Sequence, residues 1–428
     1  MDMKKPSQDD LERFPHVIFT SDVHWDPSTH DNDKSNCINN QKANINRQEY
    51  GCNIERKNNS TADAGEGRKH EKHAKQLSDL IAPETYAPEM ELREPRKMIE
   101  NLFDEEQKDG TLAWGAKTYI KRMLDNYQLM FEDLPRKYSS PMESGDSPEL
   151  DALKELDIDG IKKYQSMIGA LQWCVTLERF DIAVGVMTMS RFRAAPRKEH
   201  IERLGRIYGY LRAYPDGAIR FRTGIPNHEE FVDFPTYDWE YSVYEGISEE
   251  IPHDIPEPKG KAVRHTVFVD ANLMHCKATG RSATGILHIL NQTPVDWYSK
   301  RQSTVETATY GSEMVAARVA TEQIIDIRNT LREMGIPLDG LTWMFGDNPS
   351  VVKSSTIPHS TLKKRHNALS FHRIRAAIAA RIMHFCHIKG TDNIADVMTK
   401  FLPFVAFWPH IQPILFCMGE TFPKSEIE

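Results

Sequence analysis

The sequence lacks long apolar runs and closely spaced cysteine pairs. No stretch of about 18 consecutive apolar residues occurs, so we expect no membrane-spanning helix. The six cysteines form no C-x-x-C pair and no zinc knuckle with nearby histidines. This pattern is typical of an intracellular protein with free thiols rather than a disulfide-stapled scaffold. The N-terminus, Met1 to Ser7, is polar, and we therefore expect no signal peptide.

Acidic and basic residues are unevenly distributed along the chain. The net charge of −8 argues against a protein that coats nucleic acid over its whole surface. Residues 227–258 contain ten acidic residues, no basic ones and several prolines, which predicts an acidic, Pro-rich linker over 226–260. Residues 353–389 contain eight Lys or Arg and no acid, which favours a phosphate-binding face.

The first 110 residues differ in pattern from those that follow. They are polar, rich in Asn, Lys, Glu and Asp, and poor in aromatic residues, so we expect a largely disordered segment. After Gly115, apolar residues recur at helical spacing, and they do so again over 195–214. We therefore predict a mostly helical region over 111–225. The tail, 404–428, begins with apolar and aromatic residues and is expected to pack back on the core.

The stretch 261–403 alternates between strand and helix patterns. Three β-rich segments come first, and the second and third are joined by a predicted hairpin turn at 291–294. A long helical pattern, stopped by Gly335, is followed by a short buried strand, a helix, a strand and a last helix. The order β-β-β-α-β-α-β-α predicts an α/β fold. The predicted strands are 265–270, 282–290, 295–300, 341–345 and 383–388, and the predicted helices are 307–334, 367–381 and one from about Asn393.

Four acids stand at the edges of apolar segments: Asp270, Glu313, Asp347 and Asp396. A right-handed crossover would place the first and fourth strands side by side and parallel, so Asp270 and Asp347 would lie at neighbouring strand ends. Glu313 would face them from the long helix, and Asp396 from the start of the last one. Converging carboxylates repel one another and are costly to bury unless cations neutralise them. We therefore predict a catalytic site for two Mg²⁺ or Mn²⁺ ions, roughly 4 Å apart.

A single acid at such a position is more simply a helix cap or a surface charge. We expect Glu306, Asp326 and Asp392 to be ordinary acids of this kind. The other four acids differ because they occur in order along one strand-and-helix pattern that can bring them together.

Four strings in this stretch resemble the ribonuclease H domain of copia-type LTR retrotransposon Pol polyproteins. They are Tyr-Ser-Lys-Arg-Gln at 298–302, Tyr-Gly-Ser-Glu-Met-Val-Ala-Ala at 310–317, Gly-Asp-Asn at 346–348 and Ala-Asp-Val-Met-Thr-Lys at 395–400. Segments at 114–120 and 164–173 resemble the C-terminal thumb and connection part of the reverse transcriptase in the same polyproteins. The resemblance implies a ribonuclease H-like mixed five-stranded sheet flanked by helices.

The resemblance also implies a site and an activity. Asp270, Glu313, Asp347 and Asp396 would form an Asp-Glu-Asp-Asp metal site that cuts the RNA strand of RNA–DNA hybrids by two-metal hydrolysis. Asp270 would bridge both ions, Glu313 and Asp347 would hold one, and Asp396 the other. The polymerase part of the same element would be a partner, in a cytoplasmic virus-like particle or in the nucleus.

Motifs of the other polyprotein activities are missing. We find no aromatic-x-Asp-Asp pair in a strand context, no Asp-Ser/Thr-Gly string in an apolar context and no integrase zinc set. We therefore expect a fragment without the polymerase palm: a polyprotein-linker remnant at 1–110, a reverse-transcriptase-like region at 111–225, the linker at 226–260, a ribonuclease H-like domain at 261–403 and a tail at 404–428. Two alternatives stay open, namely a decayed remnant that only binds nucleic acid and another nuclease of the same fold.

Basic side chains near the acids are candidates for binding a hybrid duplex. Such a surface would read the A-like shape and the 2′-hydroxyls rather than the base sequence. For the two histidines of the set, a packing role is an equally open alternative. The candidates are Lys300, Arg301, Lys363, Lys364, Arg365, His366, His372 and Arg373.

Overall fold

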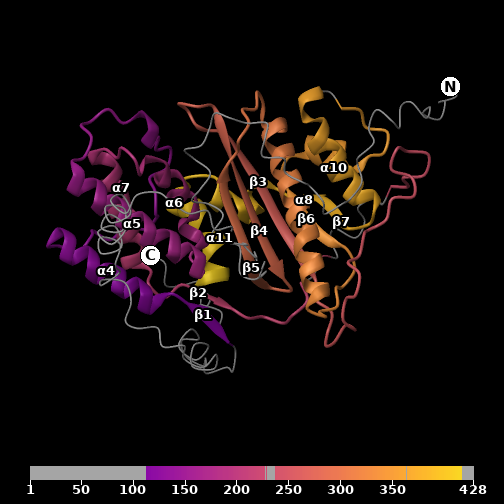
Figure 1. Ribbon diagram of the computed structural model, residues 1–428, viewed down its shortest axis with the longest axis horizontal. Coiled ribbons are helices and arrows are strands. Elements are labelled where there is room, and N and C mark those ends of the chain that lie inside the picture. Colours follow the sequence, from indigo (N-terminus) through magenta and orange to yellow (C-terminus); the bar gives the residue numbers. More distant parts are fainter. Residues whose placement is uncertain (1–111, 227, 229–236, 363, 417–428) are drawn as a thin grey trace, which may run out of the picture. The chain divides into compact units, whose positions relative to one another are not determined.

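The computed structural model describes residues 112–226, 228, 237–362 and 364–416, all within Glu94–Glu428, the second of two units into which the chain divides (Figure 1). The predicted disorder of residues 1–110 and the predicted site residue Lys363 lie outside the described residues. None of the helices in the described ranges combines the length and the apolar character that crossing a bilayer requires.

Helices dominate the first described part of the chain, which we call the helical region (residues 112–226). The helix predicted after Gly115 is α4, Lys117–Phe131, and the amphipathic helix predicted at 195–214 is α7, Lys198–Ala213. The ends of the region meet because two short strands, β1, Ala113–Gly115, and β2, Ala218–Arg220, pair antiparallel. The other elements are η1 Pro148–Leu150, α5 Ile158–Leu177, η2 Phe180–Ile182, α6 Ala183–Met189 and η3 Ser190–Phe192.

The second described part is built on five strands: β3 His265–Cys276, β4 Arg281–Leu290, β5 Thr293–Arg301, β6 Thr342–Gly346 and β7 Met383–His387. Their order in the sheet is β5-β4-β3-β6-β7. The first three strands of the chain pair antiparallel, whereas β3, β6 and β7 run parallel. This topology confirms the predicted α/β class and the mixed five-stranded sheet, including the parallel pairing of the first and fourth strands.

Three helices accompany the sheet: α8 Thr309–Glu333, α9 Pro349–Thr356 and α10 Ala368–Ala379. The first and third confirm the helices predicted at 307–334 and 367–381. The second lies in a stretch for which no helix is predicted, although the sequence carries a start signal there. The Asn348 side chain accepts hydrogen bonds from the backbone N–H groups of Ser350 and Val351, and Pro349 occupies the first helical position.

The predicted hairpin turn is too long. The loop between β4 and β5 contains only Asn291 and Gln292, and Pro294 lies within β5. β5 is an edge strand of the sheet, where a residue without an N–H group is tolerated. Asn291 has a φ of 56°, in the left-handed region that a two-residue hairpin loop requires.

The last predicted helix, from about Asn393, is also wrong. Only a 3-10 turn, η7 Ile394–Met398, forms there. The next helix, α11 Phe404–Leu415, begins after Pro403. Because a proline disfavours helical backbone angles at the residue before it, one helix could not run through this position.

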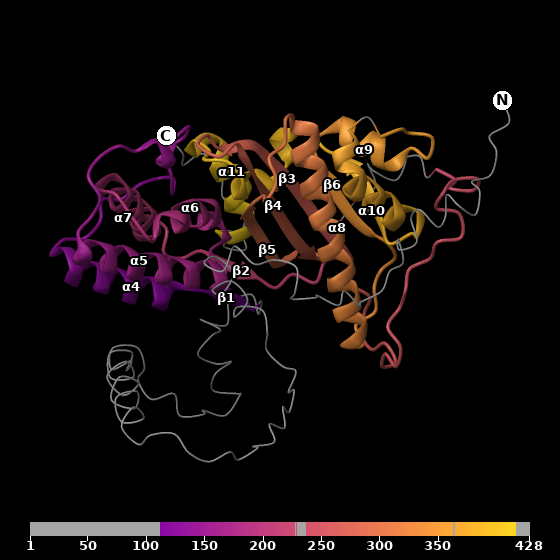
Figure 2. The same cartoon turned by 45° about the horizontal axis from the view of Figure 1, so that its top comes forward.

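The two faces of the sheet have different neighbours (Figures 1 and 2). On one face, His288 of β4 lies 3.1 Å from the Gln323 side chain of α8. On the other face, a Cβ atom added to Gly285 would lie 2.8 Å from the Ala395 carbonyl oxygen of η7. Residues 285 and 288 point to opposite faces because side chains alternate along a strand. The sheet therefore lies between α8 and a layer that contains η7.

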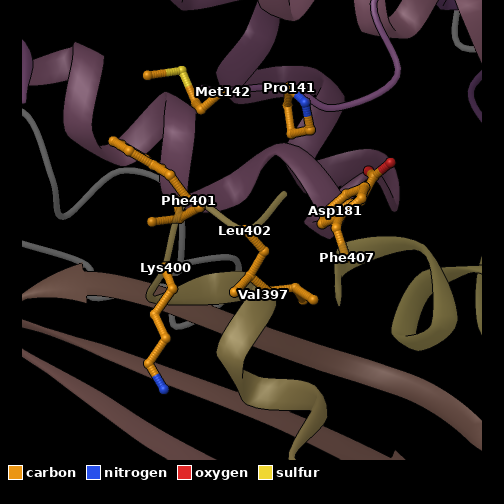
Figure 3. Close-up of a pocket in the computed structure, with 9 residues that line it drawn as sticks. Pro141, Met142, Asp181, Val397, Lys400, Phe401, Leu402 and Phe407 are labelled. Atoms are coloured by element: carbon orange, nitrogen blue, oxygen red, sulfur yellow. The ribbon is translucent and has the colours of Figure 1, made fainter. Parts of the chain in front are cut away.

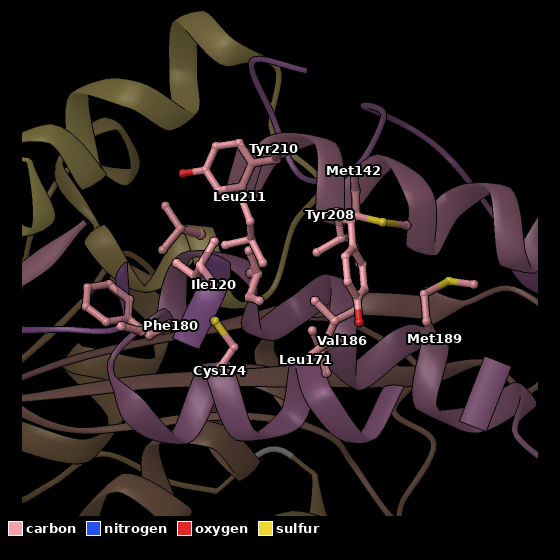
Figure 4. Packing of buried hydrophobic residues seen from close by; sticks show 14 of the residues in the cluster. Ile120, Met142, Leu171, Cys174, Phe180, Val186, Met189, Tyr208, Tyr210 and Leu211 are labelled. Atoms are coloured by element: carbon pink, nitrogen blue, oxygen red, sulfur yellow. The ribbon is translucent and has the colours of Figure 1, made fainter. Parts of the chain in front are cut away.

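The η7 face of the sheet shares one hydrophobic core with the helical region (Figure 4). Leu171, Phe180 and Tyr210 are fully buried in the same cluster as Leu287 of β4 and Met398 of η7. Residues of α11 complete this cluster, as expected for a tail that packs back. The helical region and the sheet are thus held together by apolar side chains from both that are buried in one core. The predicted division of the chain into five segments stays a prediction.

Residues 237–260, most of the described part of the acidic linker, contact the helices on the α8 side of the sheet. Glu249 forms ion pairs with Arg328 and Arg332, each with an N–O distance of 2.7 Å. The Tyr244 hydroxyl lies 2.5 Å from Nδ1 of His372 on α10. The linker therefore neutralises basic residues of α8 and packs on α10.

Candidate metal centre and nucleic-acid interface

Three of the four predicted acids meet at one point. Asp270, Glu313 and Asp347 each offer a carboxylate oxygen, and these oxygens all lie within 4.8 Å of one another. The sheet register explains the meeting of the two aspartates. Phe268 of β3 pairs with Phe345 of β6, so Asp270 and Asp347 follow at the same distance along parallel neighbouring strands. Glu313 comes from the second turn of α8.

The charged forms of Glu313 and Asp347 are destabilised at this point. Asp270 is 1% exposed. Burial, followed by repulsion from Asp270 and Asp347, raises the pKa of Glu313 well above its ordinary value. The pKa of Asp347 is raised by burial first and by Asp270 second. Such an arrangement needs a compensating positive charge.

The fourth predicted acid, Asp396, lies beside this cluster rather than within it. Its carboxylate accepts a hydrogen bond from the Lys400 ammonium at 2.6 Å, and the same ammonium lies 3.2 Å from Oδ1 of Asp270. Burial, and then the charge of Asp270, raise the pKa of Asp396 to about 7. Lys400 is therefore a partner of two of the predicted acids, although it is not itself among the predicted site residues. Its signal in the sequence is the i,i+4 spacing from Asp396.

A threonine next to Lys400 holds the deepest carboxylate. The Thr399 hydroxyl donates a short hydrogen bond to Oδ2 of Asp270. The Thr399 carbonyl in turn accepts a hydrogen bond of 3.0 Å from the Asn272 side chain. The close approach of this segment to the sheet depends on Gly285, which is paired with Asp270 across β3 and β4. Both oxygens of Asp270 thus have partners from residues 399 and 400.

The donor set fits a hard divalent cation. All the ligands that the cluster offers are carboxylate oxygens, which suit Mg²⁺ and Mn²⁺ better than softer metals. The raised pKa values of Glu313 and Asp347 express a repulsion that such an ion would relieve. The acids of β3, α8 and the loop after β6 are therefore suitable to hold one ion. Asp396, together with Asp270, is placed to hold a second.

Two predicted basic residues lie at the end of β5. Lys300 is exposed, and Arg301 pairs with Ala283 of β4. Burial and the positive charges of Arg191 and Arg281 lower the pKa of Arg301. Arg191 comes from the helical region and donates a hydrogen bond to the Cys276 sulfur at 2.7 Å. The structure thus gathers arginines from both described parts of the chain on the η7 face.

The remaining predicted basic residues surround α10, and several of them have partners within the chain. The Lys364 ammonium donates to the Thr307 hydroxyl at 3.4 Å. His366 Nε2 lies 3.0 Å from Glu306, for which a surface or cap acid is predicted; at 5% exposed it is not a surface acid. His372 contacts Tyr244. Arg365 is exposed, and Arg373 is partly buried. Both histidines thus have partners within the chain, and their predicted roles in binding nucleic acid stay predictions.

The strand order and the acids at the ends of β3 and β6, with a third acid on α8, define a ribonuclease H-like domain. The chain is similar to "Retrovirus-related Pol polyprotein from transposon RE1" of Arabidopsis thaliana, with 24% identity over 261 residues, 61% of this chain and 15% of that protein. It is also similar to the corresponding polyprotein of transposon TNT 1-94 of Nicotiana tabacum, with 23% identity over 318 residues, 72% of this chain and 21% of that protein. The predicted resemblance to a retrotransposon Pol polyprotein is confirmed.

The chain spans only a small part, 15% and 21%, of these two polyproteins. Among solved structures, it is similar to LC11-RNase H1 in complex with an RNA/DNA hybrid, with 17% identity and a TM-score of 0.26. That similarity covers 32% of this chain and 94% of the other. No protein-family model matches the chain. The fold assignment therefore depends on the strand order of the sheet itself.

Proposed function

We propose that the chain carries a ribonuclease H-type nuclease of a retrotransposon Pol polyprotein, which cuts the RNA strand of RNA–DNA hybrids. One observation carries the proposal: three carboxylates with oxygens within 4.8 Å of one another at the ends of adjacent parallel strands and on α8. A buried cluster of like charges is costly for folding and therefore needs a functional reason. The similarity to transposon polyproteins supports a nucleic-acid substrate.

Each acid has a role in this proposal. Asp270, Glu313 and Asp347 would hold one divalent ion, and Asp270 with Asp396 a second. When bound, such ions supply an activated water and neutralise the charge of the leaving 3′-oxygen. Asp270 is the best candidate for a shared ligand, because it is the most buried of the four predicted acids and is held by the Thr399 hydroxyl.

The arginines on the η7 face are the best candidates for the backbone of the duplex. Arg301 lies two residues along β5 from Ser299, which is level with Asp270 across the sheet. With strands about 4.8 Å apart and about 3.4 Å per residue, Arg301 lies on the order of 12 Å from the acids. A phosphate held there would position the duplex without reading its sequence.

The direct test is cleavage by the 428-residue chain of three duplexes of one sequence, with the label on a single strand. We expect cuts within the RNA strand of the hybrid in Mg²⁺ or Mn²⁺, no cuts in double-stranded DNA or RNA, and none with a chelator present. Binding of the hybrid without any cut would support the decayed remnant instead. Cleavage of double-stranded DNA at a comparable rate would favour another nuclease of the same fold.

Gly285→Ala tests whether the approach of η7 to the sheet matters. The added Cβ would lie 2.6 Å from Cγ2 of Thr399 and 2.8 Å from the Ala395 carbonyl oxygen, so η7 must move outward. Because Asp396 lies on η7, we expect cleavage to fall by about a hundredfold, the effect of a misplacement of about 1 Å. The free energy of unfolding should fall by only about 1–3 kcal/mol.

The matched control is Gly169→Ala on α5, where an added Cβ meets nothing within 4 Å. That change should leave cleavage intact and raise stability by about 0.5–1 kcal/mol, because alanine favours a helix over glycine. An unchanged cleavage rate in Gly285→Ala would show that the position of η7 does not limit the reaction.

A further inference from the structure

The Lys400 side chain lies between Asp270 and Asp396 of the candidate metal centre. Its ammonium group contacts Asp396 at 2.6 Å and Asp270 at 3.2 Å, so it joins the fourth acid to the deepest one. Figure 3 shows its side chain extending toward the sheet, away from the pocket at the base of the residue, which Met142 and Asp181 also line. The ammonium thus lies where an ion shared by Asp270 and Asp396 would be bound.

The backbone of Lys400 is fixed, whereas its side chain is flexible and partly exposed. The Lys400 N–H donates to the Asp396 carbonyl at 2.9 Å, and the next residues, Phe401 and Leu402, pack against the core shared with the helical region. The side chain is 32% exposed. Four flexible methylene groups therefore lead from a rigid anchor to a charge with a path to solvent.

The charges around the ammonium explain why it lies there. Asp270, Glu313 and Asp347 form one cluster with Asp396 beside it, and among the described residues Lys400 is the cation that contacts both Asp270 and Asp396. A single positive charge on a tether partly relieves the repulsion of the acids in the absence of an ion. A divalent ion shared by Asp270 and Asp396 would have to displace it, since both cations need the same carboxylate oxygens.

We propose that Lys400 is a tethered counterion that stabilises the metal-free centre and competes with a divalent ion for Asp270 and Asp396. The inference depends on the proposed function only in that the acids must bind such ions. It assigns to Lys400 a role opposite to that of a ligand: the residue strengthens the fold without metal and weakens the binding of metal. In this proposal Lys400 acts on the metal only through the acids and does not contact the substrate.

The test is thermal unfolding of the full chain, first in chelator and then during titration with MgCl₂ or MnCl₂. In chelator, Lys400→Met should lower the unfolding temperature by about 5 °C, because the acids lose their counterion. In the titrations, the metal concentration that gives a fixed rise in unfolding temperature should fall about tenfold relative to the unmutated chain. Lys400→Arg, which keeps the charge, should resemble the unmutated chain in both respects.

The chain offers a matched control for the ion pair itself. Lys163 pairs with Asp159 at the same i,i+4 spacing, and its side chain is similarly exposed at 36%. Lys163→Met should change neither the stability in chelator by more than about 1 °C nor the metal dependence. If Lys400→Met does not fold in chelator, Lys400→Gln carries the same test, because the amide removes the charge and keeps a hydrogen-bond donor on a slightly shorter side chain.

Three outcomes separate the inference from the proposed function. Equal metal dependence of the unmutated chain and the Lys400→Met or Lys400→Gln variant would overturn the counterion role while leaving the metal centre intact. A tenfold shift in Lys400→Met that disappears when Asp396→Asn is added would locate the competing ion at Asp396 and support the counterion role. No response to either ion in any variant would overturn both the counterion role and the proposed metal centre.

Discussion

Replacing Asp347 with asparagine should abolish metal-dependent cleavage of the hybrid while it raises the stability of the metal-free chain. Asparagine has the same shape but offers no charge to an ion, and losing about 4 kcal/mol of transition-state stabilisation lowers the rate about a thousandfold. Stability should rise because burial and the charge of Asp270 both disfavour the ionised carboxylate in the fold. The neutral amide removes that repulsion.

Two measurements check this pair of effects: the cleavage rate in MgCl₂ and the unfolding temperature in chelator. The nearby control is Asp392→Asn, since Asp392 is exposed and its partner is the hydroxyl of Thr391 at 3.1 Å. That variant should keep both the rate and the stability of the unmutated chain. If Asp347→Asn cut the hybrid at more than about a tenth of the unmutated rate, the metal centre would have to lie elsewhere.

The sheet is predictable from the sequence because its signals are local. The β-rich runs, a tight turn at Asn291 and one long helical pattern fix the element order, and the right-handed crossover then fixes the parallel pair. Asp270 and Asp347 could be assigned to neighbouring strand ends for the same reason. The convergence of Glu313 on them required only that the long helix lie across the sheet.

The contacts that were not predicted are those between segments far apart in the chain. Nothing local to Lys400 distinguishes an ammonium inserted among buried acids from a helix-surface partner of Asp396. The pairing of His366 with the buried Glu306 joins residues 60 positions apart, so no local pattern in the sequence predicts it. The basic run at 353–389 therefore indicated a phosphate-binding face, whereas some of its members have partners within the chain.

Local rules did exist for two of the misjudged elements. Asn348 followed by Pro349 is a helix start that predicts α9. Pro403 limits any helix that begins near Asn393 to a few residues, which leaves room only for the 3-10 turn. In both places, a cap or a breaker carries more information than the apolar spacing around it.

Replacing Asp181 with alanine should destabilise the whole described fold by about 3–5 kcal/mol, because it leaves a buried guanidinium without its counterion. Arg179 and Asp181 are both 0% exposed, and they form an ion pair of 2.7 Å within the core that joins the helical region to η7. The guanidinium cannot escape the cost by losing its proton. Burial raises the pKa of Glu178 to about 8, so this neighbour carries little charge near neutral pH.

Asp181→Asn separates the lost charge from the lost volume. Asparagine fills the same space and still accepts the hydrogen bond that the Tyr210 hydroxyl donates at 2.7 Å, yet it leaves Arg179 uncompensated. If charge dominates, denaturant unfolding should show a loss close to that of the alanine variant. Full recovery of stability would instead assign the effect to the cavity. The surface pair Arg318–Glu322, at i,i+4 spacing, sets the scale, since Glu322→Ala should cost less than about 0.5 kcal/mol.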